Sequence, residues 1–412
     1  MLKSLVVALS IAMVTLAAPS QAVQYKVTDL GVNADWQNGF HPRSINNSGE
    51  VLAWLNQPYG SGRDWIVERP TVWNGQTWLQ MPEIDGRSGL DWTYFSESMN
   101  DHGVVAVTAM RTAVDYGEPG DNGIQSYLWN SRTNAITALN NPSPNNGFGN
   151  LAGANAINNH GTVAGAMGEA VLGDSASYRA MTWKNGTYTD VSGGLMPGNS
   201  DAQLINGQGA VVGQIYSGED DNSVAAFFTD GATVRHFLMP QGKDDFDMMD
   251  MNDQGIVVFN VEGACDANGC GQVGYIWNPV SGETLMVPST PGIPFTGSSA
   301  NGINNLGQVV GRGMEGDPYT NWDSGLLWDP VDGIQPLNEL VVSDAAGHQF
   351  WVREGYDIND HGVILATGAY HTTPLEGRLL LLTPVPEPET YALMLAGLGL
   401  VGFAARRNSQ RN

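Results

Sequence analysis

The pattern of hydrophobic and polar positions along this chain repeats a short hairpin seven times. The clearest copy, residues 303–311, reads Ile-Asn-Asn-Leu-Gly-Gln-Val-Val-Gly, and an aromatic strand follows it at residues 326–328. In every copy an Ile or Met precedes an Asn, and a Gly stands three positions after that Asn. A β-branched residue follows two positions after the Gly and the next position is apolar. The pattern predicts a buried strand after each turn.

The Asn and the Gly of each copy fit the geometry of a tight turn. An Asn at the first position of a type I turn can bond its side chain to the backbone ahead, and a Gly at the fourth position accepts a left-handed conformation. We therefore assign a structural role in the repeat turns to one set of residues. They are Asn46, Gly49, Asn100, Gly103, Asn158, Gly161, Asn206, Gly209, Asn252, Gly255, Asn304, Gly307, Asn359 and Gly362.

Each repeat contains a second hairpin, because the aromatic strand is followed by a turn such as Asn74-Gly75 or Asp230-Gly231 and then by a fourth strand. Two hairpins in roughly fifty residues are typical of a β-propeller blade. The sequence thus predicts an all-β fold, a propeller of seven four-stranded blades over residues 23–384. Another all-β repeat assembly is the alternative. The strand expected at residues 25–31 has no aromatic partner before it, so it can supply the missing edge of the last blade.

Composition agrees with strands and tight turns and limits the partners. Gly is abundant at 52 residues, and charged residues make up only 15% of the chain. The formal net charge of -24 argues against nucleic acid as a partner, because a phosphate backbone is bound by Lys and Arg. It also disfavours attraction to an anionic lipid surface.

The first 22 residues resemble a secretory signal peptide. Lys3 gives the positive start, residues 5–16 form an apolar run, and Ser20 and Ala22 are the small residues that signal peptidase inspects. We expect cleavage after Ala22. A membrane-anchoring helix is the alternative, although the run is short for a bilayer.

The last segment, residues 385–412, contains a Pro-rich motif, an apolar stretch and a basic end. The motif is Val385-Pro386-Glu387-Pro388, the apolar stretch covers residues 391–405, and Arg406 and Arg407 follow it. This order predicts an extended entry, a single short transmembrane helix and a cationic stop, with everything before the helix facing outward. An ordinary C-terminal anchor is the alternative to the sorting function considered next.

This tail resembles the PEP-CTERM sorting domain of Gram-negative bacteria, which has the same three parts in the same order. The resemblance implies processing by an exosortase, passage through an inner-membrane intermediate, and delivery to the cell surface or the extracellular space. It also implies association with exopolysaccharide or biofilm matrix. The repeats in turn resemble the HAF repeat of bacterial extracellular proteins, although no copy carries the His-Ala-Phe that gives that family its name.

The only two cysteines are Cys265 and Cys270, which flank an Asn/Gly turn. In an exported protein this spacing predicts a local disulfide. Two thiolates alone would leave a zinc site half built, so metal binding is the weaker alternative.

The chain shows no catalytic motif and no metal site. His102, His160 and His361 occupy equivalent turn positions, which we interpret as exposed turn residues. Acidic stretches such as 219–221 and 244–247 are expected in solvated loops, with calcium binding as a minor possibility and no other cofactor. The loops also carry aromatic residues that could stack on sugars or pack against the fold, namely Trp36, Trp65, Trp92, Trp322 and Trp351.

The sequence therefore predicts an exported structural or binding protein whose partners are signal peptidase, exosortase and exopolysaccharide. A carbohydrate-active enzyme on a propeller scaffold is the alternative function, and it would need two facing carboxylates at a defined separation.

Overall fold

The computed structural model describes most of the chain between the two ends. The described residues are 23–33, 39–58, 66–84, 92–95, 98–111, 124–139, 150–169, 177–192, 199–216, 223–238, 246–266, 269–287, 298–314, 323–342, 347 and 349–385. The compact unit Tyr25–Val385 contains all strands and is considered by itself. The expected signal peptide, transmembrane helix and Arg406-Arg407 pair lie outside the described residues.

Four antiparallel sheets of four strands follow one another along the first part of this unit. The first contains β2 (Phe40–Ile45), β3 (Val51–Pro58), β4 (Ile66–Trp73) and β5 (Trp78–Gln80). The second contains β6 (Trp92–Phe95), β7 (Val104–Arg111), β8 (Ile124–Asn130) and β9 (Ala135–Ala138). The third contains β10 (Asn150–Ile157), β11 (Val163–Glu169), β12 (Ser177–Lys184) and β13 (Thr187–Asp190). The fourth contains β14 (Asn199–Ile205), β15 (Val211–Tyr216), β16 (Ser223–Thr229) and β17 (Val234–Leu238).

Two further groups of four strands join through a single parallel pair, Val273 with Ser298, into one eight-stranded sheet. One group is β18 (Phe246–Met251), β19 (Val257–Asp266), β20 (Gly269–Asn278) and β21 (Glu283–Met286). The other is β22 (Ser298–Ile303), β23 (Val309–Met314), β24 (Asp323–Asp329) and β25 (Gly333–Pro336), which is followed by the one-turn helix α1 (Leu337–Leu340).

The last sheet joins the beginning of the described chain to its end. It contains β27 (Phe350–Ile358), β28 (Ile364–Tyr370) and β29 (Thr373–Pro384), and its outer strand is β1 (Tyr25–Asn33) from the start of the chain. Antiparallel pairing sets Tyr25 opposite Pro384. The two-residue strand β26 (Val341–Val342) covers the other edge of β1. The N-terminal strand therefore completes the final sheet, as the sequence predicts, and it does not remain an exposed edge.

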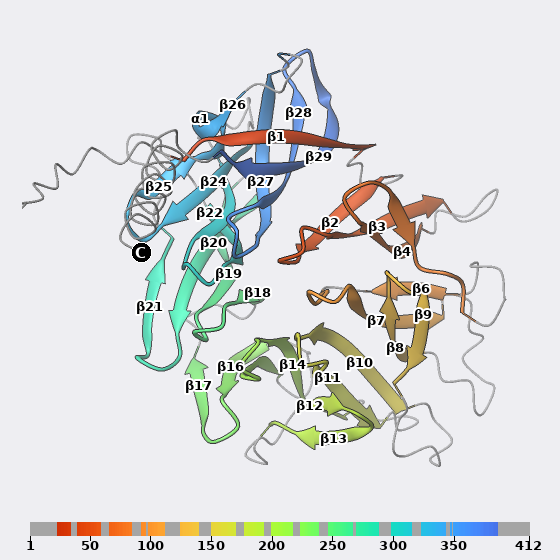
Figure 1. The fold of residues 1–412 in the computed structure, drawn as a ribbon. Helices are drawn as coiled ribbons and strands as arrows, with labels where there is room; N and C mark the ends of the chain where they lie inside the picture. The colour runs from red at the N-terminus through yellow and green to blue at the C-terminus, as the bar shows by residue number, and fades with distance from the viewer. Residues whose placement is uncertain are drawn as a thin grey trace, which may run out of the picture. The chain divides into compact units, whose positions relative to one another are not determined.

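The sheets succeed each other around a common centre, toward which their first strands face (Figure 1). The hydrophobic core lies between neighbouring sheets, as where Leu52 and Val72 pack against Val105 and Trp129. Leu365 and Leu379 of the last sheet pack in the same way against Val51 of the first. The chain is all-β, and this circular succession of sheets is that of a β-propeller.

The first strand of most sheets contains a β-bulge close to its end. The residue skipped by the register is Arg43, Asn155, Gln203, Met249, Asn301 or Tyr356. On the neighbouring strand, a Cβ added at Gly165, Gly213 or Gly311 would lie between 1.8 and 2.1 Å from a backbone oxygen of the bulged strand. The small residue after each apolar pair is thus required by close approach of two backbones.

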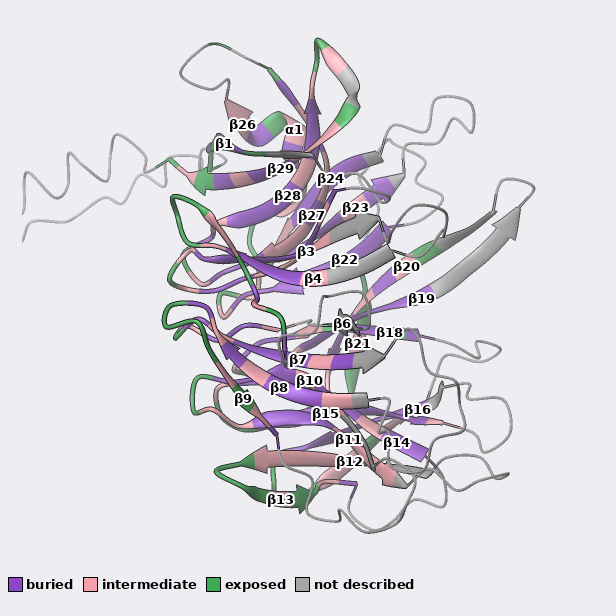
Figure 2. Cartoon of the chain, turned by 90° about the vertical axis from the view of Figure 1, so that its right-hand side faces the viewer, coloured by how far each residue is buried: buried purple, intermediate pink, exposed green. Residues whose placement is uncertain are grey.

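Short turns gather at one end of the sheets, where they are exposed, while the strands behind them are buried (Figure 2). The histidines His102, His160 and His361 are exposed on three of these turns. Among the residues that the structure describes, no helix is long and apolar enough to span a membrane.

Candidate functional site

The turn of each repeat is built by its asparagine. In the copy that begins at Asn100, the side-chain Oδ1 accepts hydrogen bonds from the backbone N–H groups of His102 and Val104, each at 3.0 Å. The backbone N–H of Gly103 donates to the Asn100 carbonyl oxygen at 3.0 Å. Gly103 has a φ of 71°, a left-handed value that favours glycine.

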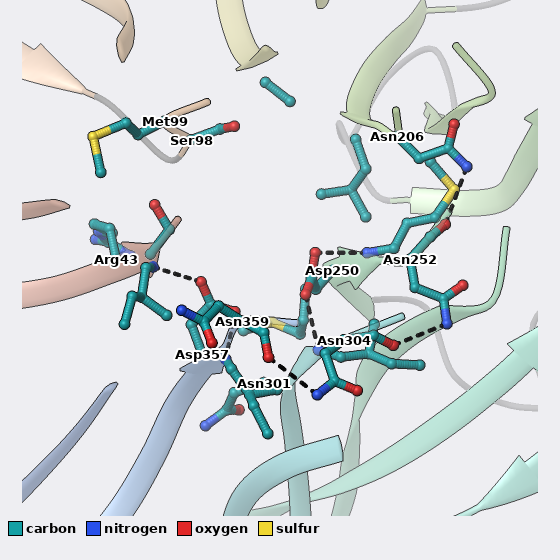
Figure 3. A pocket seen from close by; sticks show the side chains of 18 of the residues that line it. Arg43, Ser98, Met99, Asn206, Asp250, Asn252, Asn301, Asn304, Asp357 and Asn359 are labelled. Atoms are coloured by element: carbon teal, nitrogen blue, oxygen red, sulfur yellow. Dashed lines mark hydrogen bonds between the residues drawn. The ribbon is translucent and has the colours of Figure 1, made fainter. Parts of the chain in front are cut away.

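The same asparagines also bind one another. The Nδ2 of each donates to the carbonyl oxygen of the equivalent asparagine in the next repeat, at distances between 3.0 and 3.2 Å. The succession is Asn46, Asn100, Asn158, Asn206, Asn252, Asn304, Asn359 and again Asn46. Figure 3 shows part of this series around the cavity. The asparagines thus form a closed circle, which we call the asparagine ring.

The ring is buried, since its members are only 2–5% exposed. A buried amide with unsatisfied hydrogen-bonding groups would cost about 1–3 kcal/mol. Here the oxygen is satisfied by the residue's own turn and the nitrogen by the next repeat. Each asparagine therefore holds one turn in shape and joins two neighbouring repeats.

The position after each ring asparagine forms a second series of links. Its backbone N–H donates to the side-chain oxygen at the same position of the next repeat, at distances of 2.7–2.9 Å. The residues in order are Asn47, Asp101, Asn159, Gly207, Asp253, Asn305 and Asp360. Gly207 has no side chain to accept from Asn159, so this series is interrupted between those two repeats.

The carboxylates of the second series are kept apart, because no two of them are consecutive. The Nδ2 of Asn305 donates to Asp253 at 3.1 Å and to Asp360 at 2.9 Å. The Nδ2 of Asn47 donates to Asp360 at 2.9 Å. Amide side chains therefore separate the acids and donate to them, which limits repulsion between like charges.

The ring encloses an open cavity of about 920 Å³ at the centre of the sheets (Figure 3). Its wall comes from the first strands β2, β10, β14, β18, β22 and β27, and it includes all six of the bulged residues. Most of these side chains are amides, carboxyls or guanidinium groups. The guanidinium of Arg43 is stacked over the Trp54 ring at 3.4 Å from its centroid.

Two carboxylates of the cavity wall bridge neighbouring repeats. Asp250 accepts from the backbone N–H of Ile303 at 2.8 Å, and Asp357 accepts from that of Ile45 at 2.7 Å. Figure 3 shows both carboxylates beside the asparagine ring. Gly302 leaves room for one of them, because a Cβ there would lie 2.8 Å from the Asp357 Oδ1. One oxygen of each acid thus links two repeats, and the other oxygen accepts from the backbone N–H of the next residue in its own strand, at 2.7 Å in both cases.

The cavity acids are poised to hold protons more tightly than usual. Burial raises the pKa of Asp201 to about 7, although the hydrogen bond from Asn155 at 2.8 Å opposes the shift. Burial also raises the pKa of Asp250 and of Asp357, and the charge of Asp250 adds to the effect on Asp357. The wall therefore carries less negative charge near neutral pH than its composition implies.

The remaining residues singled out from the sequence occupy separate places. Val385 directly follows β29 and is 40% exposed, whereas Pro386, Glu387 and Pro388 lie outside the described residues. Cys265 and Cys270 are directly opposite each other in the register of β19 and β20. Their side chains are not described, so the disulfide stays a prediction.

The expectation that several aromatic and acidic residues lie in loops is wrong for three of them. Trp92 is the first residue of β6, Trp351 is in β27, and Asp247 is in β18, where it lines the cavity. These three residues lie at the beginnings of strands that start earlier than the repeat pattern indicated. The pattern therefore underestimated the lengths of these strands. Trp36, Trp65 and Trp322, and the acidic stretch 219–221, lie outside the described residues. Within the described ranges, no group of three or more His, Cys, Asp or Glu side chains could hold a metal ion.

Sequence reasoning explained the turn asparagines but missed their second role. An Asp or Ser side chain can also accept hydrogen bonds in a type I turn. Only Asn among these residues adds an N–H₂ donor that can reach the next repeat. The strict use of Asn in all seven copies was the signal for the asparagine ring.

One family and several solved structures resemble parts of this chain. The PEP-CTERM protein-sorting motif matches residues 384–408. No protein of curated function matches the chain in sequence. Among solved structures, an oligogalacturonate lyase from Vibrio parahaemolyticus is 12% identical with a TM-score of 0.46, and covers 88% of this chain and 98% of its own.

The β-propeller domain of the Trilobed protease from Pyrococcus furiosus is 9% identical, with a TM-score of 0.45 and coverage of 84% of this chain and 94% of its own. A protein of unknown function from Dyadobacter fermentans is 10% identical, with a TM-score of 0.41 and coverage of 75% and 97%. At these scores the likeness supports no conclusion about a ligand or an activity. The sorting motif implies that this chain is processed by an exosortase and exported to the cell surface or the extracellular space.

Proposed function

We propose that this chain is an exported binding protein of the cell surface or the extracellular matrix, sorted by an exosortase after passage through an inner-membrane intermediate. The match of the PEP-CTERM motif to residues 384–408 is the observation that carries the proposal. Residues 1–22 serve as the signal peptide, and an apolar helix over residues 391–405 anchors the intermediate in the membrane. The repeats, of HAF type, form the folded body over residues 23–384.

The body is a propeller of seven four-stranded blades in this proposal. Seven asparagines joined in one closed series of hydrogen bonds support that number. The pairing of β1 with β29 supports closure of the last blade by the N-terminal strand.

The binding partner is exopolysaccharide or another polymer of the biofilm matrix. The central cavity of about 920 Å³ presents amide and carboxyl groups, which can exchange hydrogen bonds with sugar hydroxyls. The two bridging acids, Asp250 and Asp357, already accept backbone N–H groups. Their engagement favours a binding or structural role over acid–base catalysis.

The first test is the C-terminus of the mature protein, measured by mass spectrometry from the native host and from a strain without its exosortase. We expect loss of the segment after the Val385-Pro386-Glu387-Pro388 motif only in the competent strain. An intact Arg406-Arg407 end in both strains would contradict sorting. Co-purification of matrix polysaccharide with the processed protein then tests the binding role, with purified polymer titrated against it.

A further inference from the structure

The sorting motif begins inside the folded body. Pro384 is the last residue of β29 and pairs with Tyr25, and the motif match starts at this same residue. Tyr25 is only 1% exposed, and burial together with the nearby Asp329 carboxylate raises its pKa to about 12. The described body therefore ends at Val385, the residue directly before Pro386 of the motif.

An enzyme that binds this peptide in its active site must approach the folded body closely. Three extended residues span at most about 10 Å. An active site that holds Pro386, Glu387 and Pro388 therefore lies within about 10 Å of Val385. The enzyme therefore also contacts the surface around Val385.

Three apolar side chains are exposed at Val385 and on the turns of the preceding repeat. Leu306 is 63% exposed, Val331 is 87% exposed and Val385 is 40% exposed. In the other six repeats, the turn position of Leu306 is held by polar residues: Ser48, His102, His160, Gln208, Gln254 and His361. Exposed apolar side chains mark an interaction site when they are grouped at one place rather than scattered singly.

Close approaches between the turns of two adjacent repeats place these residues near one another. A Cβ on Gly307, next to Leu306, would lie 3.7 Å from the Pro330 ring, which precedes Val331. A Cβ on Gly362 would lie 3.3 Å from the Pro384 ring and 3.8 Å from Gln308. Pro330 and Pro384 thus cover equivalent turn glycines of adjacent repeats, and each is followed by an exposed valine. We call Leu306, Val331 and Val385 the exit surface.

We propose that the exit surface is a docking site for the exosortase that processes this chain, and this inference rests on the proposed sorting. The neighbouring acids Asp329 and Asp332, and the net charge of -24, disfavour an anionic lipid surface as the occupant. The Asp329 carboxylate accepts from the backbone N–H of Val331 at 2.8 Å and from Gln308 at 3.0 Å. These bonds fix the turn that presents Val331, so the surface is preorganised.

The test measures conversion of the full-length precursor in a host that has the exosortase, followed by pulse labelling and mass spectrometry. In the L306S/V331S variant we expect conversion to slow at least fivefold. Val280→Ser is the matched control, because Val280 is 65% exposed and follows Pro279 in the equivalent turn of the preceding repeat. We expect its rate to stay within twofold of the parent, and both variants to unfold at the parental temperature.

A second variant carries ten Gly and Ser residues between Val385 and Pro386. We expect slower conversion, because the ten added residues let an enzyme bind the motif without approaching the exit surface. Parental or faster conversion of either the spacer variant or L306S/V331S would overturn the docking proposal while leaving sorting intact. A parent chain that is not converted at all would instead overturn the proposed function.

Photo-crosslinking identifies the occupant directly. A photoreactive amino acid at position 331 is expected to form an adduct with the exosortase. Adducts only with lipid, or only with a second copy of this chain, would also overturn the proposal.

Discussion

Arg132 forms a two-pronged ion pair with Glu50 of the preceding repeat, with Nε–Oε1 and Nη2–Oε2 distances of 2.9 and 2.8 Å. Glu50 also accepts from the ring asparagine Asn46 at 2.8 Å. Burial opposes ionisation of Glu50, but the hydrogen bonds from Arg132 and Asn46 and the Arg132 charge together hold its pKa below the usual value. Through Glu50, the ion pair thus connects the surface turn that contains Arg132 to the ring asparagine Asn46 of the preceding repeat.

Glu50→Gln is expected to destabilise the protein by about 1–2 kcal/mol at pH 7, because it removes the charge-assisted part of this pair. A lowered pKa gives stability that is present above the unfolded value near 4.5 and is lost as pH falls through the folded value. The difference in unfolding free energy between parent and variant should therefore shrink below about pH 4. Urea unfolding at pH 7 and pH 3.5 measures it, and a difference that does not change with pH would contradict the assignment.

Asn206→Ala should destabilise the protein by about 2–3 kcal/mol, because it leaves the carbonyl of Asn252 and the turn amides of Gln208 and Ala210 without their partner. Asn206→Asp separates the two roles of the side chain. It keeps the acceptor for the turn but sets a carboxylate against the Asn252 carbonyl. We expect this variant to be unstable at pH 7 and to recover as pH falls and the acid becomes a donor.

If Asn206→Asp were as stable as the parent at pH 7, the link between repeats would contribute nothing. Gln208→Ala is the matched control, since Gln208 is exposed in the same turn. It should change the unfolding free energy by less than about 0.5 kcal/mol.

Gly165→Ala is expected to cost at least about 3 kcal/mol, because the added Cβ would lie 1.8 Å from the Gly153 carbonyl oxygen. Gly153→Ala, on the paired strand, is the matched control. Its Cβ would come no closer than 3.8 Å, to Asn155 Oδ1, so the change should be within about 1 kcal/mol. Thermal unfolding of the two variants compares them, and equal effects would show that the close approach of the strands is relaxed in solution.

Asp201→Asn tests the protonation of the cavity wall. The pKa of Asp201 is raised from its usual 3.8 to about 7, so the folded state binds a proton that the unfolded state releases. That contribution to stability is complete below about pH 4 and is lost as pH rises through 7. The neutral amide keeps an acceptor for Asn155 and does not lose a proton as pH rises. The free energy of unfolding of the variant, relative to that of the parent, should therefore increase by up to about 2 kcal/mol between pH 5 and pH 8. If the free energies of unfolding of both proteins depended equally on pH, the raised pKa of Asp201 would be contradicted.

Cys265 and Cys270 should form a disulfide in the exported protein. Directly opposite residues in an antiparallel pair have Cβ atoms about 4.5–5.5 Å apart, close to the separation that a disulfide needs. We expect alkylation of the unfolded, unreduced protein to modify no thiol, and Cys265→Ser to expose one. Because the disulfide closes only a short loop, its loss should lower the free energy of unfolding by about 2 kcal/mol. Two alkylated thiols in the exported parent would exclude the bond.

The sequence predicted those features that repeat locally. The spacing of Asn304 and Gly307 predicted a turn, and the lone strand that begins at Tyr25 predicted the closing edge. The cavity acids could not be predicted, because Asp250 and Asp357 occupy a repeat position that elsewhere holds Ser44, Ser98, Ala156, Leu204 or Gly302. Their significance depends on the backbone N–H groups of Ile303 and Ile45, the latter more than three hundred residues away in the chain. Contacts of that kind arise only when the sheets meet around the centre.

The asparagine ring has a direction but no beginning or end. In a linear array of repeats the terminal units have one neighbour, so they fray first and need special caps. Here every repeat donates to one neighbour and accepts from the other, and the first and last strands of the described body, β1 and β29, pair with each other. Opening the circle at any one asparagine should therefore weaken all seven repeats together, so the body should unfold in a single cooperative transition.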